Sequence, residues 1–433
     1  MDSYDNRKPS DIEWIGDIPQ HWYPKKLKYL GDVLGGSTPD TGNRDYWNGD
    51  IIWVTPSDIS KIAGNYIYDS QRKITQEGLE NSGASLVETE SIIITTRAPI
   101  GNMVLAGLRL CTNQGCKSLT VRNGSPLFYY YQLVSFRGPL EALGVGTTFN
   151  ELSTDALKGF LLLSPPEEEQ TAIARYLDGK STEINELVAN KRLLIELLNE
   201  ERTAIINQAV TKGINANTNY HPSGFDWLGD IPEDWQVKKL KYISPKVMVG
   251  LVINPSTYFD PLGTVPMLTG RNVTPNNINV KSANVITQES NEALHKTRLA
   301  DGDIVVVRVG YPGVAAVVRG AVAGANCASM MIVRKGDFDS DFLCYCFNSN
   351  VGRSQVAMVE YGAAQKQFNI SHAVEFFFPV PPLEEQRNIA GFIKTETRKI
   401  DSTIAKIENE IDLLQEYGTA LISEVVTGKL KVV

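Results

Sequence analysis

The side chains that most often bind metals or attack substrates are few in this sequence and are not spaced for either task. The five cysteines fall into two groups, Cys111 with Cys116 and Cys327 with Cys344 and Cys346, and none of them forms a Cys-x-x-Cys pair. The four histidines are scattered. Structural zinc sites use close pairs of cysteine or histidine, so this spacing predicts inert, buried thiols and no metal site.

Sequence signatures of nucleotide chemistry are also missing. There is no Gly-x-x-x-x-Gly-Lys-Ser/Thr loop to bind ATP phosphates, and no Gly-x-Gly-x-x-Gly after a strand to bind a nucleotide cofactor. The Asn-Pro-Pro-Tyr or Asp-Pro-Pro-Tyr segment that amino-methyltransferases use on a flipped base is absent, and no cluster of acids with a lysine indicates a nuclease. We therefore predict a chain without catalytic residues and without a cofactor.

Composition and charge narrow the class of protein. With 433 residues, of which 42% are hydrophobic and 21% charged, the chain is long enough for two or three domains of ordinary globular composition. It has no apolar run near the roughly 18 residues that span a bilayer, and its first residues lack the apolar stretch of a signal peptide. We therefore expect a cytoplasmic protein that does not engage a membrane. A net charge of −8 argues against nucleic-acid binding unless cations gather on one face or partner subunits supply phosphate contacts.

The sequence contains one unit twice. The segment Trp14–Pro19 (Trp-Ile-Gly-Asp-Ile-Pro) returns 213 residues later as Trp227–Pro232 (Trp-Leu-Gly-Asp-Ile-Pro). A second block, Pro165–Gln170 (Pro-Pro-Glu-Glu-Glu-Gln), returns 216 residues later as Pro381–Gln386 (Pro-Pro-Leu-Glu-Glu-Gln). Because both blocks repeat at nearly one separation, the chain is predicted to be two copies of a unit of about 215 residues.

The first part of each unit, residues 25–164 and 238–380, is predicted to be a compact domain that mixes helices and strands. Short runs rich in β-branched residues alternate with glycine, proline and asparagine, which is typical of strands and turns. A helix-like stretch follows late in each copy. The clearest predicted strands are 91–96 and 303–308, and the predicted helices are 127–143 and 341–361.

A long helix is predicted after each domain. Pro-Pro followed by acidic residues is a good helix start, since proline suits the first turn and acids suit its positive end. Apolar residues then recur at alternating spacings of four and three, which is typical of coiled coils. Lys191 and Arg202 interrupt this stripe in the first copy, and Gly418 occupies one of its positions in the second. The stripe consists of Ile400, Ile404, Ile407, Ile411, Leu414, Leu421 and Val425 in the second copy, and of Ile184, Val188, Ile195, Leu198, Ile205 and Ala209 in the first.

Neither helix can bury a one-sided stripe alone, so we predict that the two pack on each other as a coiled coil rather than each on its own domain. A duplicated unit closes most simply about a two-fold axis, which makes the helices antiparallel and inverts one domain relative to the other. The predicted fold class is therefore mixed α+β, with two pseudo-symmetric globular domains joined by two long helices that form an antiparallel coiled coil. The predicted boundaries are 1–164 for the first domain, 165–213 for its helix, 214–380 for the second domain and 381–433 for its helix.

This arrangement resembles the specificity subunits of Type I restriction–modification systems. Pro-Pro-x-Glu-Glu-Gln at the start of a long helix is similar to their conserved regions, and Trp-x-Gly-Asp-Ile-Pro-x-x-Trp is similar to the start of their target-recognition domains. Residues 46–54, 96–101 and 111–115 of the first domain are similar as well, whereas the second domain has 308–313 and 325–327 in place of the last two segments. Because different domains of this family read different sequences, the divergence implies an asymmetric target.

The resemblance implies a DNA-reading role without catalysis in this chain. Each target-recognition domain would read one half of a bipartite site on double-stranded DNA, and the coiled coil would set the length of the unread spacer. Two methyltransferase (modification) subunits would dock on the helices and methylate adenine after flipping the base out of the duplex. Restriction subunits would add ATP-driven translocation and cleavage. Two inverted domains would suit the pseudo-two-fold symmetry of duplex DNA.

Reading a base sequence needs hydrogen-bond donors and acceptors in loops, commonly arginine on guanine and asparagine or glutamine on adenine. Polar residues in turns that follow strand-like runs are therefore the predicted base contacts, although such residues also cap turns by bonding to their own backbone. The lysines of 25–28 and their copies in 238–241 are candidate phosphate contacts or simply lie on an exposed edge. The predicted base contacts are Thr55, Ser57, Arg97, Asn102, Asn113, Gln114, Thr147 and Thr148 in the first domain, and Thr269, Arg271, Asn272, Arg308, Tyr311, Asn326, Gln365, Lys366 and Gln367 in the second.

Two other classes of protein remain as alternatives. An enzyme would need one of the missing motifs, and a two-headed coiled-coil scaffold would bind proteins rather than DNA. Co-purification with a methyltransferase and a sequence-specific shift of duplex DNA separate both classes from the DNA-reading hypothesis. The recognised bases, the spacer length and the presence of a restriction subunit do not follow from any pattern in the sequence.

Overall fold

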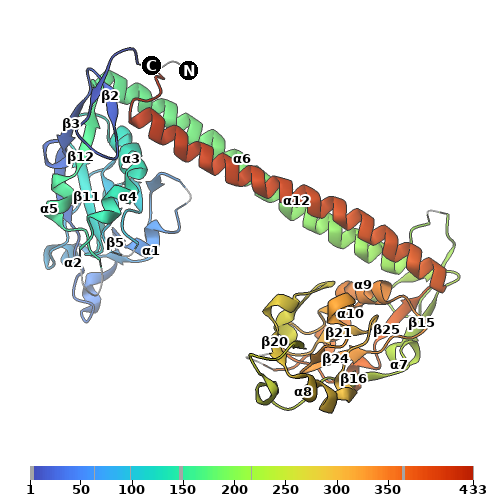
Figure 1. The fold of residues 1–433 in the computed structure, drawn as a ribbon. Coiled ribbons are helices and arrows are strands. Elements are labelled where there is room, and N and C mark those ends of the chain that lie inside the picture. The colour runs from blue at the N-terminus through green and yellow to red at the C-terminus, as the bar shows by residue number, and fades with distance from the viewer. Residues whose placement is uncertain are drawn as a thin grey trace. The chain divides into compact units, whose positions relative to one another are not determined.

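The computed structural model describes residues 4–62, 64–97, 99–145, 150–215, 217–362 and 366–432. It divides into two compact units, one formed by residues 1–191 with 408–433 and the other by residues 192–407. The division cuts both long helices, so each unit consists of one globular domain and one half of each helix (Figure 1).

A five-stranded sheet forms the centre of the globular domain in unit 1. Its strands are, in order, β4 (Gly31–Gly35), β11 (Cys116–Val121), β8 (Ile92–Thr95), β9 (Met103–Ala106) and β6 (Tyr66–Ile67). Successive residues of β8 point to opposite faces, and both faces are buried. Ile92 and Ile94 pack with helix α3 (Pro126–Ser135), whereas Ile93 packs with strand β5 (Trp47–Val54) of a smaller sheet. Burial on both faces explains the continuous apolar run, and the predicted strand at 91–96 is confirmed.

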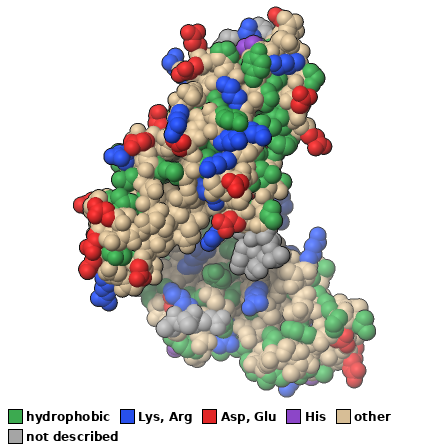
Figure 2. Space-filling model, turned by 90° about the vertical axis from the view of Figure 1, so that its left-hand side faces the viewer, with side chains coloured by type: hydrophobic (Ala, Val, Ile, Leu, Met, Phe, Trp, Pro, Cys, Tyr) green, Lys and Arg blue, Asp and Glu red, His purple; other side chains and the backbone are tan. Residues whose placement is uncertain are grey.

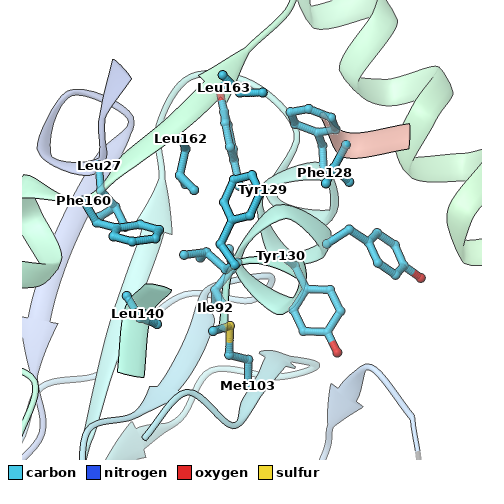
Figure 3. Close-up of a cluster of buried hydrophobic side chains, with 14 of the residues drawn as sticks. Leu27, Ile92, Met103, Phe128, Tyr129, Tyr130, Leu140, Phe160, Leu162 and Leu163 are labelled. Atoms are coloured by element: carbon cyan, nitrogen blue, oxygen red, sulfur yellow. The ribbon is translucent and has the colours of Figure 1, made fainter. Parts of the chain in front are cut away.

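The helical face of this sheet holds the main core of unit 1. Phe128, Tyr129 and Tyr130 of α3 lie among Ile92 of β8 and Leu163 of strand β12 (Leu161–Ser164) (Figure 3). None of these five side chains is more than 6% exposed. Burial of one large apolar side chain contributes about 1.5–3 kcal/mol to folding, so this cluster fixes the helix on the sheet.

Each of the two predicted helices late in the domains is divided in two. The helix predicted at 127–143 is α3 and α4 (Arg137–Ala142), because Pro139 has no N–H to continue a helix and its ring would clash with the preceding turn. The helix predicted at 341–361 is α9 (Ser340–Asn348) and α10 (Asn350–Val359). Ser349 divides these two, since its hydroxyl accepts a hydrogen bond from the first turn of α10.

Unit 2 repeats the architecture around a four-stranded antiparallel sheet. Its strands are, in order, β16 (Val247–Val249), β24 (Met330–Val333), β21 (Ile304–Val307) and β22 (Ala315–Val317). Ile304 and Val306 pack with α9, whereas Val305 and Val307 pack with strand β17 (Val265–Leu268) of a second small sheet. The predicted strand at 303–308 is therefore confirmed, again with both faces buried.

The repeated Pro-Pro-x-Glu-Glu-Gln segment joins each domain to its long helix. In unit 1 the side-chain oxygen of Gln170, in helix α6 (Glu167–Lys212), accepts a hydrogen bond from the backbone N of Ser125 at the start of α3. Gln386, in helix α12 (Leu383–Val426), binds the backbone N of Asp339 at the start of α9 in the same way. Each glutamine also donates to the carbonyl of the first proline of its motif. The glutamine is therefore a clamp between the domain and the helix.

The predicted antiparallel coiled coil is present in each unit, where α6 and α12 run side by side (Figure 1). In unit 1, Ile184 of α6 lies against Gly418 of α12, and Lys191 forms an ion pair with Glu410. Partner numbers fall along α12 as they rise along α6, so the helices are antiparallel. The residues of the predicted stripe are buried or half-buried along both helices.

Ion pairs neutralise the charge of both polar interruptions of the stripe, while the buried Nε of Arg202 has no hydrogen-bond partner among the described residues. Lys191 pairs with Glu410 in unit 1, and Arg202 pairs with Asp401 of α12 in unit 2. The side chains of Lys191 and Arg202 are 21% and 32% exposed, so their aliphatic parts lie along the seam while their cations reach a carboxylate at its edge. Lysine and arginine therefore fit this coiled coil without leaving an unpaired buried charge.

The described residues contain no helix that is both long and apolar enough to cross a membrane. In the same ranges, no three side chains of histidine, cysteine, aspartate or glutamate are grouped to hold a metal ion. All five cysteines are free and buried, as predicted. Burial raises the pKa of Cys111, Cys116 and Cys327 to about 12, so these thiols are protonated at neutral pH.

Candidate nucleic-acid interface

A polar loop cluster lies at the end of the central strand β8 in unit 1. Backbone bridges join Arg97 to Glu151 and Val145 to Glu151, so the chain after β8 is held against the chain before helix α5 (Thr154–Gly159). Nε of Arg97 donates a hydrogen bond to Oε2 of Glu151 at 3.1 Å. The side chain of Arg97 is 49% exposed and that of Glu151 is 39% exposed. The predicted residue Arg97 therefore lies at the surface, beside a carboxylate that the sequence did not single out.

A buried lysine lies next to this ion pair. Lys117 belongs to β11, where its neighbours Cys116 and Leu119 are fully buried, and Lys117 itself is 6% exposed. Its Nζ donates to the carbonyl oxygen of Leu152 at 2.8 Å and lies 4.0 Å from Oε1 of Glu151. Burial lowers the pKa of Lys117, and the nearby Glu151 carboxylate opposes that shift. A lysine inside an apolar strand was the available signal in the sequence, and our sequence reasoning missed it.

Other predicted residues of the first domain form local hydrogen bonds. Thr55 caps helix α1 (Pro56–Ile59), and its hydroxyl lies 2.9 Å from that of Ser57. Asn113 accepts a hydrogen bond from the backbone N two residues ahead, and Gln114 accepts one from the hydroxyl of Thr38. Ser57 and Gln114 are exposed, whereas Thr55, Asn102 and Asn113 are half-buried.

Some predicted residues of the second domain are used inside the fold. Thr269 caps a short 3-10 turn together with Asn272, which is 4% exposed. Asn326 is fully buried and hydrogen-bonded to Thr297 and Asn291. A buried, satisfied amide reaches a base only if its surroundings open, so we leave Asn272 and Asn326 out of the interface.

Three predicted residues of the second domain are well exposed. Arg271 and Lys366 are cations at the surface, and Lys366 forms an ion pair with Glu360. Tyr311 is 82% exposed. These side chains are free to meet a ligand. Three further predicted base contacts lie outside the described residues and stay predictions, namely Thr147, Thr148 and Gln365.

The second domain has a corresponding loop cluster at the end of β21. Backbone bridges join Val309 to Gln367 and Tyr361 to Gln367, as they join Arg97 and Val145 to Glu151 in the first domain. Gln367 is half-buried and is the position equivalent to Glu151. The same local geometry is therefore built twice, with different side chains.

Backbone pairing agrees with the match of segment 96–101 to segment 308–313 that was made from the sequence. The carbonyl of Thr96 accepts a hydrogen bond from the amide of Leu152, and the carbonyl of Arg308 accepts one from the amide of Phe368. Arg308 therefore occupies the position of Thr96, and Val309 occupies that of Arg97. Nε of Arg308 is also turned inward, to the carbonyl oxygen of Phe368 at 3.2 Å.

The buried residue of the strand beside each loop cluster also differs between the two domains. Lys117 of β11 pairs with the next-to-last residue of β8, and Met331 of β24 pairs with the next-to-last residue of β21, so these two residues are equivalent. Met331 is fully buried. The first domain thus combines a buried lysine with Glu151, where the second combines a buried methionine with Gln367.

The repeated lysines near the start of each domain have different surroundings. Lys239 and Lys241 form ion pairs with Glu375 and hold the pKa of that carboxyl below its usual value. In the first copy Gly159 stands at the position of Glu375, and among the described residues the exposed lysines of 25–28 form no ion pair. In Figure 2, lysine and arginine side chains gather along the middle of the visible face of unit 1, with a few acidic ones among them and more acidic ones toward its edges.

Comparison with protein families gives one match that covers both copies. The model described as the Type I restriction modification DNA specificity domain matches residues 19–197 and 232–413. The Type I restriction enzyme MjaIX specificity subunit of Methanocaldococcus jannaschii is 31% identical over 229 residues, so the match spans about half of each chain, 52%. The putative MjaX specificity subunit of the same organism is 24% identical over 96% of both chains. The EcoR124I/EcoR124II specificity subunit of Escherichia coli is 26% identical over 44% of this chain and 46% of that one.

Solved structures show the same fold. A chain from a structure on complex assembly and conformational transition of the type I R-M system superposes with a TM-score of 0.70, covering 95% of this chain and 99% of that chain. The HsdS subunit from Thermoanaerobacter tengcongensis superposes with a TM-score of 0.53, covering 95% and 98%. Both are 15% identical to this chain, so the likeness concerns the fold alone.

Proposed function

This chain belongs to the family of Type I restriction–modification DNA specificity subunits, and from that premise we propose that it reads a bipartite, asymmetric site on double-stranded DNA. Each globular domain contacts one half of the site. The observation that carries this proposal is the family match to both copies, together with unlike side chains at equivalent backbone positions. Arg97 and Glu151 in one domain stand where Val309 and Gln367 stand in the other. Unlike donor and acceptor sets read unlike bases.

We assign base reading to the loop clusters after β8 and β21. Exposed or half-exposed donors and acceptors there and in the adjoining turns can face a groove without rearrangement. The lysines of 25–28 contribute phosphate contacts in the first domain, since no acid among the described residues forms an ion pair with them. The proposed base-reading residues are Arg97, Asn102, Gln114, Arg271, Tyr311, Lys366 and Gln367, with Thr55, Ser57, Asn113, Thr269 and Arg308 as supports of the same turns and Thr147, Thr148 and Gln365 as predictions from the sequence.

The long helices set the spacer and dock two methyltransferase subunits. Leu193, Leu194 and Leu197 of α6 in unit 2 are 53%, 44% and 51% exposed. Leu413 and Tyr417 of α12 in unit 1 are 54% and 51% exposed. Large apolar side chains outside the seam suit packing against partner helices. This chain performs no catalytic step: the methyltransferase subunits methylate adenine, and restriction subunits translocate and cleave. The domain boundaries 1–164, 165–213, 214–380 and 381–433 belong to the same proposal.

A domain exchange tests the proposal. Residues 25–164 are replaced by the first domain of a relative, the chain is co-expressed with its methyltransferase, and methylated DNA is sequenced. We expect one half of the methylated site to change and the other to stay. A change in both halves, or in neither, would contradict the assignment of one domain to each half. A scaffold that does not bind DNA would give neither sequence-specific methylation nor a shift of duplex DNA.

A further inference from the structure

We propose that Glu151 is a specificity-determining residue of the first domain, accepting a hydrogen bond from the exocyclic amino group of a cytosine or adenine beside the base that Arg97 contacts. The inference rests on the proposed DNA-reading function. Glu151 lies at the surface of the loop cluster, and Nε of Arg97 holds one of its oxygens at 3.1 Å. The pair therefore offers one donor group and one acceptor group side by side.

The chemistry of the two side chains selects opposite base edges. A carboxylate only accepts hydrogen bonds, so in the major groove it selects an amino group, N4 of cytosine or N6 of adenine. Thymine O4 and guanine O6 and N7 are acceptors and would face the carboxylate without a proton between them. A guanidinium only donates, so it selects guanine O6 and N7. Arg97 and Glu151 together therefore match a guanine and a neighbouring base that carries an amino group.

A carboxylate at a DNA surface needs compensation, because DNA phosphates repel it. Lys117 adds to the compensation that Arg97 gives, with its Nζ 4.0 Å from Oε1 of Glu151 while it donates to the carbonyl oxygen of Leu152. A buried lysine is costly in a protein unless it is paired or fully hydrogen-bonded. The cost at position 117 is offset by the negative charge beside it.

The second domain provides an internal comparison. Its residues at the same positions are Met331, which is buried, and Gln367, which is half-buried. Where the surface residue is neutral, the buried residue is neutral as well. Charge at the two positions therefore changes together between the copies, which is expected if Lys117 is present because Glu151 is.

The test compares four variants of the full chain in complex with its methyltransferase subunits. Binding is measured on a library of duplexes randomised through both half-sites. In the native complex we expect one position of the first half-site to prefer an amino-bearing base over thymine by about 10- to 100-fold. Glu151→Gln should reduce that preference about tenfold, because an amide both donates and accepts. Selectivity in the second half-site should not change.

Glu88→Gln is the matched control. Glu88 forms an ion pair with NH2 of Arg109 at 3.1 Å, in the same domain but before β8 instead of after it. This variant should leave both half-sites unchanged. Lys117→Met should weaken binding to every library member, because Glu151 then keeps Arg97 as its one neighbouring cation among the described residues. The double variant Lys117→Met with Glu151→Gln recreates the pair of the second domain. It should therefore fold, and it should bind the library more tightly than Lys117→Met alone. Thermal unfolding of each variant shows whether it is folded.

The outcomes separate the two levels of the argument. Native binding that favours no sequence would overturn the proposed function and this assignment with it. Selective native binding that Glu151→Gln leaves unaltered overturns the assignment alone. An equal loss of affinity across the whole library in folded Glu151→Gln also overturns it, since that pattern belongs to a residue that only supports the loop.

Discussion

Arg97 has the chemistry and the position of a base-reading side chain. Its Nε is bound to Glu151, which fixes the plane of the guanidinium, while about half of the side chain is exposed, 49%. A guanidinium oriented in this way loses little conformational freedom when it presents two donors to guanine. A substitution of Arg97 should therefore change the base preference at a single position of the DNA site.

Arg97→Ala should weaken recognition by about 1–3 kcal/mol, the usual worth of one two-donor base contact. We expect methylation to relax at one base of one half-site, measured by sequencing methylated DNA from cells that express the complex. Arg109→Ala is the control, since Arg109 pairs with Glu88 at the other end of β8. A uniform loss over specific and random DNA would make Arg97 a phosphate contact, and loss of folding would make it structural.

The cysteines give a prediction that does not depend on function. Burial raises the pKa of Cys111, Cys116 and Cys327 to about 12, so at pH 8 the reactive thiolate is scarce as well as inaccessible. We expect the native chain to resist a thiol reagent at pH 8, and all five thiols to react once the chain is unfolded in denaturant. Rapid labelling of a native cysteine would show that the domain opens around it.

The type of residue at the interface was more predictable than its exposure. Polar residues in turns after strands were identified, and Arg97, Gln114 and Tyr311 are indeed at the surface or half-exposed. Asn326 fits the same pattern in sequence but is buried by a segment far from it in the chain. Glu151 is 54 residues from Arg97, so only the folded chain brings the pair together.

At the scale of elements, the long helices were the most predictable part of the fold. Their apolar spacing is a local signal that repeats over many turns, and it fixed the seam and both polar interruptions. The strands carry far less information, because β6, β7 (Lys73–Ile74) and β10 (Cys111–Thr112) have two residues each. Their order in the sheet depends on pairing between distant segments, which no local pattern specifies.

Gly418→Ala should stabilise the coiled coil. A Cβ at Gly418 would lie 3.4 Å from Cδ1 of Ile184, an ordinary packing distance, and alanine is preferred over glycine inside a helix by about 0.5–1 kcal/mol. Gly391→Ala is the matched control, since a Cβ there meets nothing within 4 Å on the same helix. Thermal unfolding should show a gain for both, slightly larger for Gly418→Ala. A loss confined to Gly418→Ala would mean that the helices are closer than this contact indicates.

At the scale of the whole molecule, duplication places two different sets of side chains on one fold, and in the proposed function these sets read two different half-sites. The sheet, the glutamine clamp and the loop bridges are repeated, so each domain offers its loops in the same local frame. The side chains on that frame have diverged, so the two half-sites of the proposed function need not be related in sequence. The helices are the part common to both units. If the protein sets the distance between the half-sites, it must do so through the length of these helices.

Lengthening both helices tests whether they set the distance between the half-sites. Seven residues inserted after Leu198 of α6 and after Thr403 of α12 enter at opposing points of the antiparallel pair, so the seam and the ion pair between Arg202 and Asp401 are kept. The insertion adds about 10 Å at 1.5 Å per residue, which corresponds to roughly three base pairs of duplex. Three base pairs rotate one half-site relative to the other by about 100° about the duplex axis. Seven residues of a straight helix rotate its apolar stripe by only about 20° about the helix axis.

The longer coiled coil therefore cannot match a longer spacer without twisting the DNA or bending the protein. We expect the native site to be lost, and a site with three more spacer base pairs to be bound weakly or not at all, in binding assays on a series of duplexes with graded spacers. Circular dichroism and thermal unfolding establish that the lengthened helices still form. Undiminished affinity for the native spacing in a folded variant would show that the helices do not set it, because two domains held by a longer coiled coil could not then meet the same two half-sites.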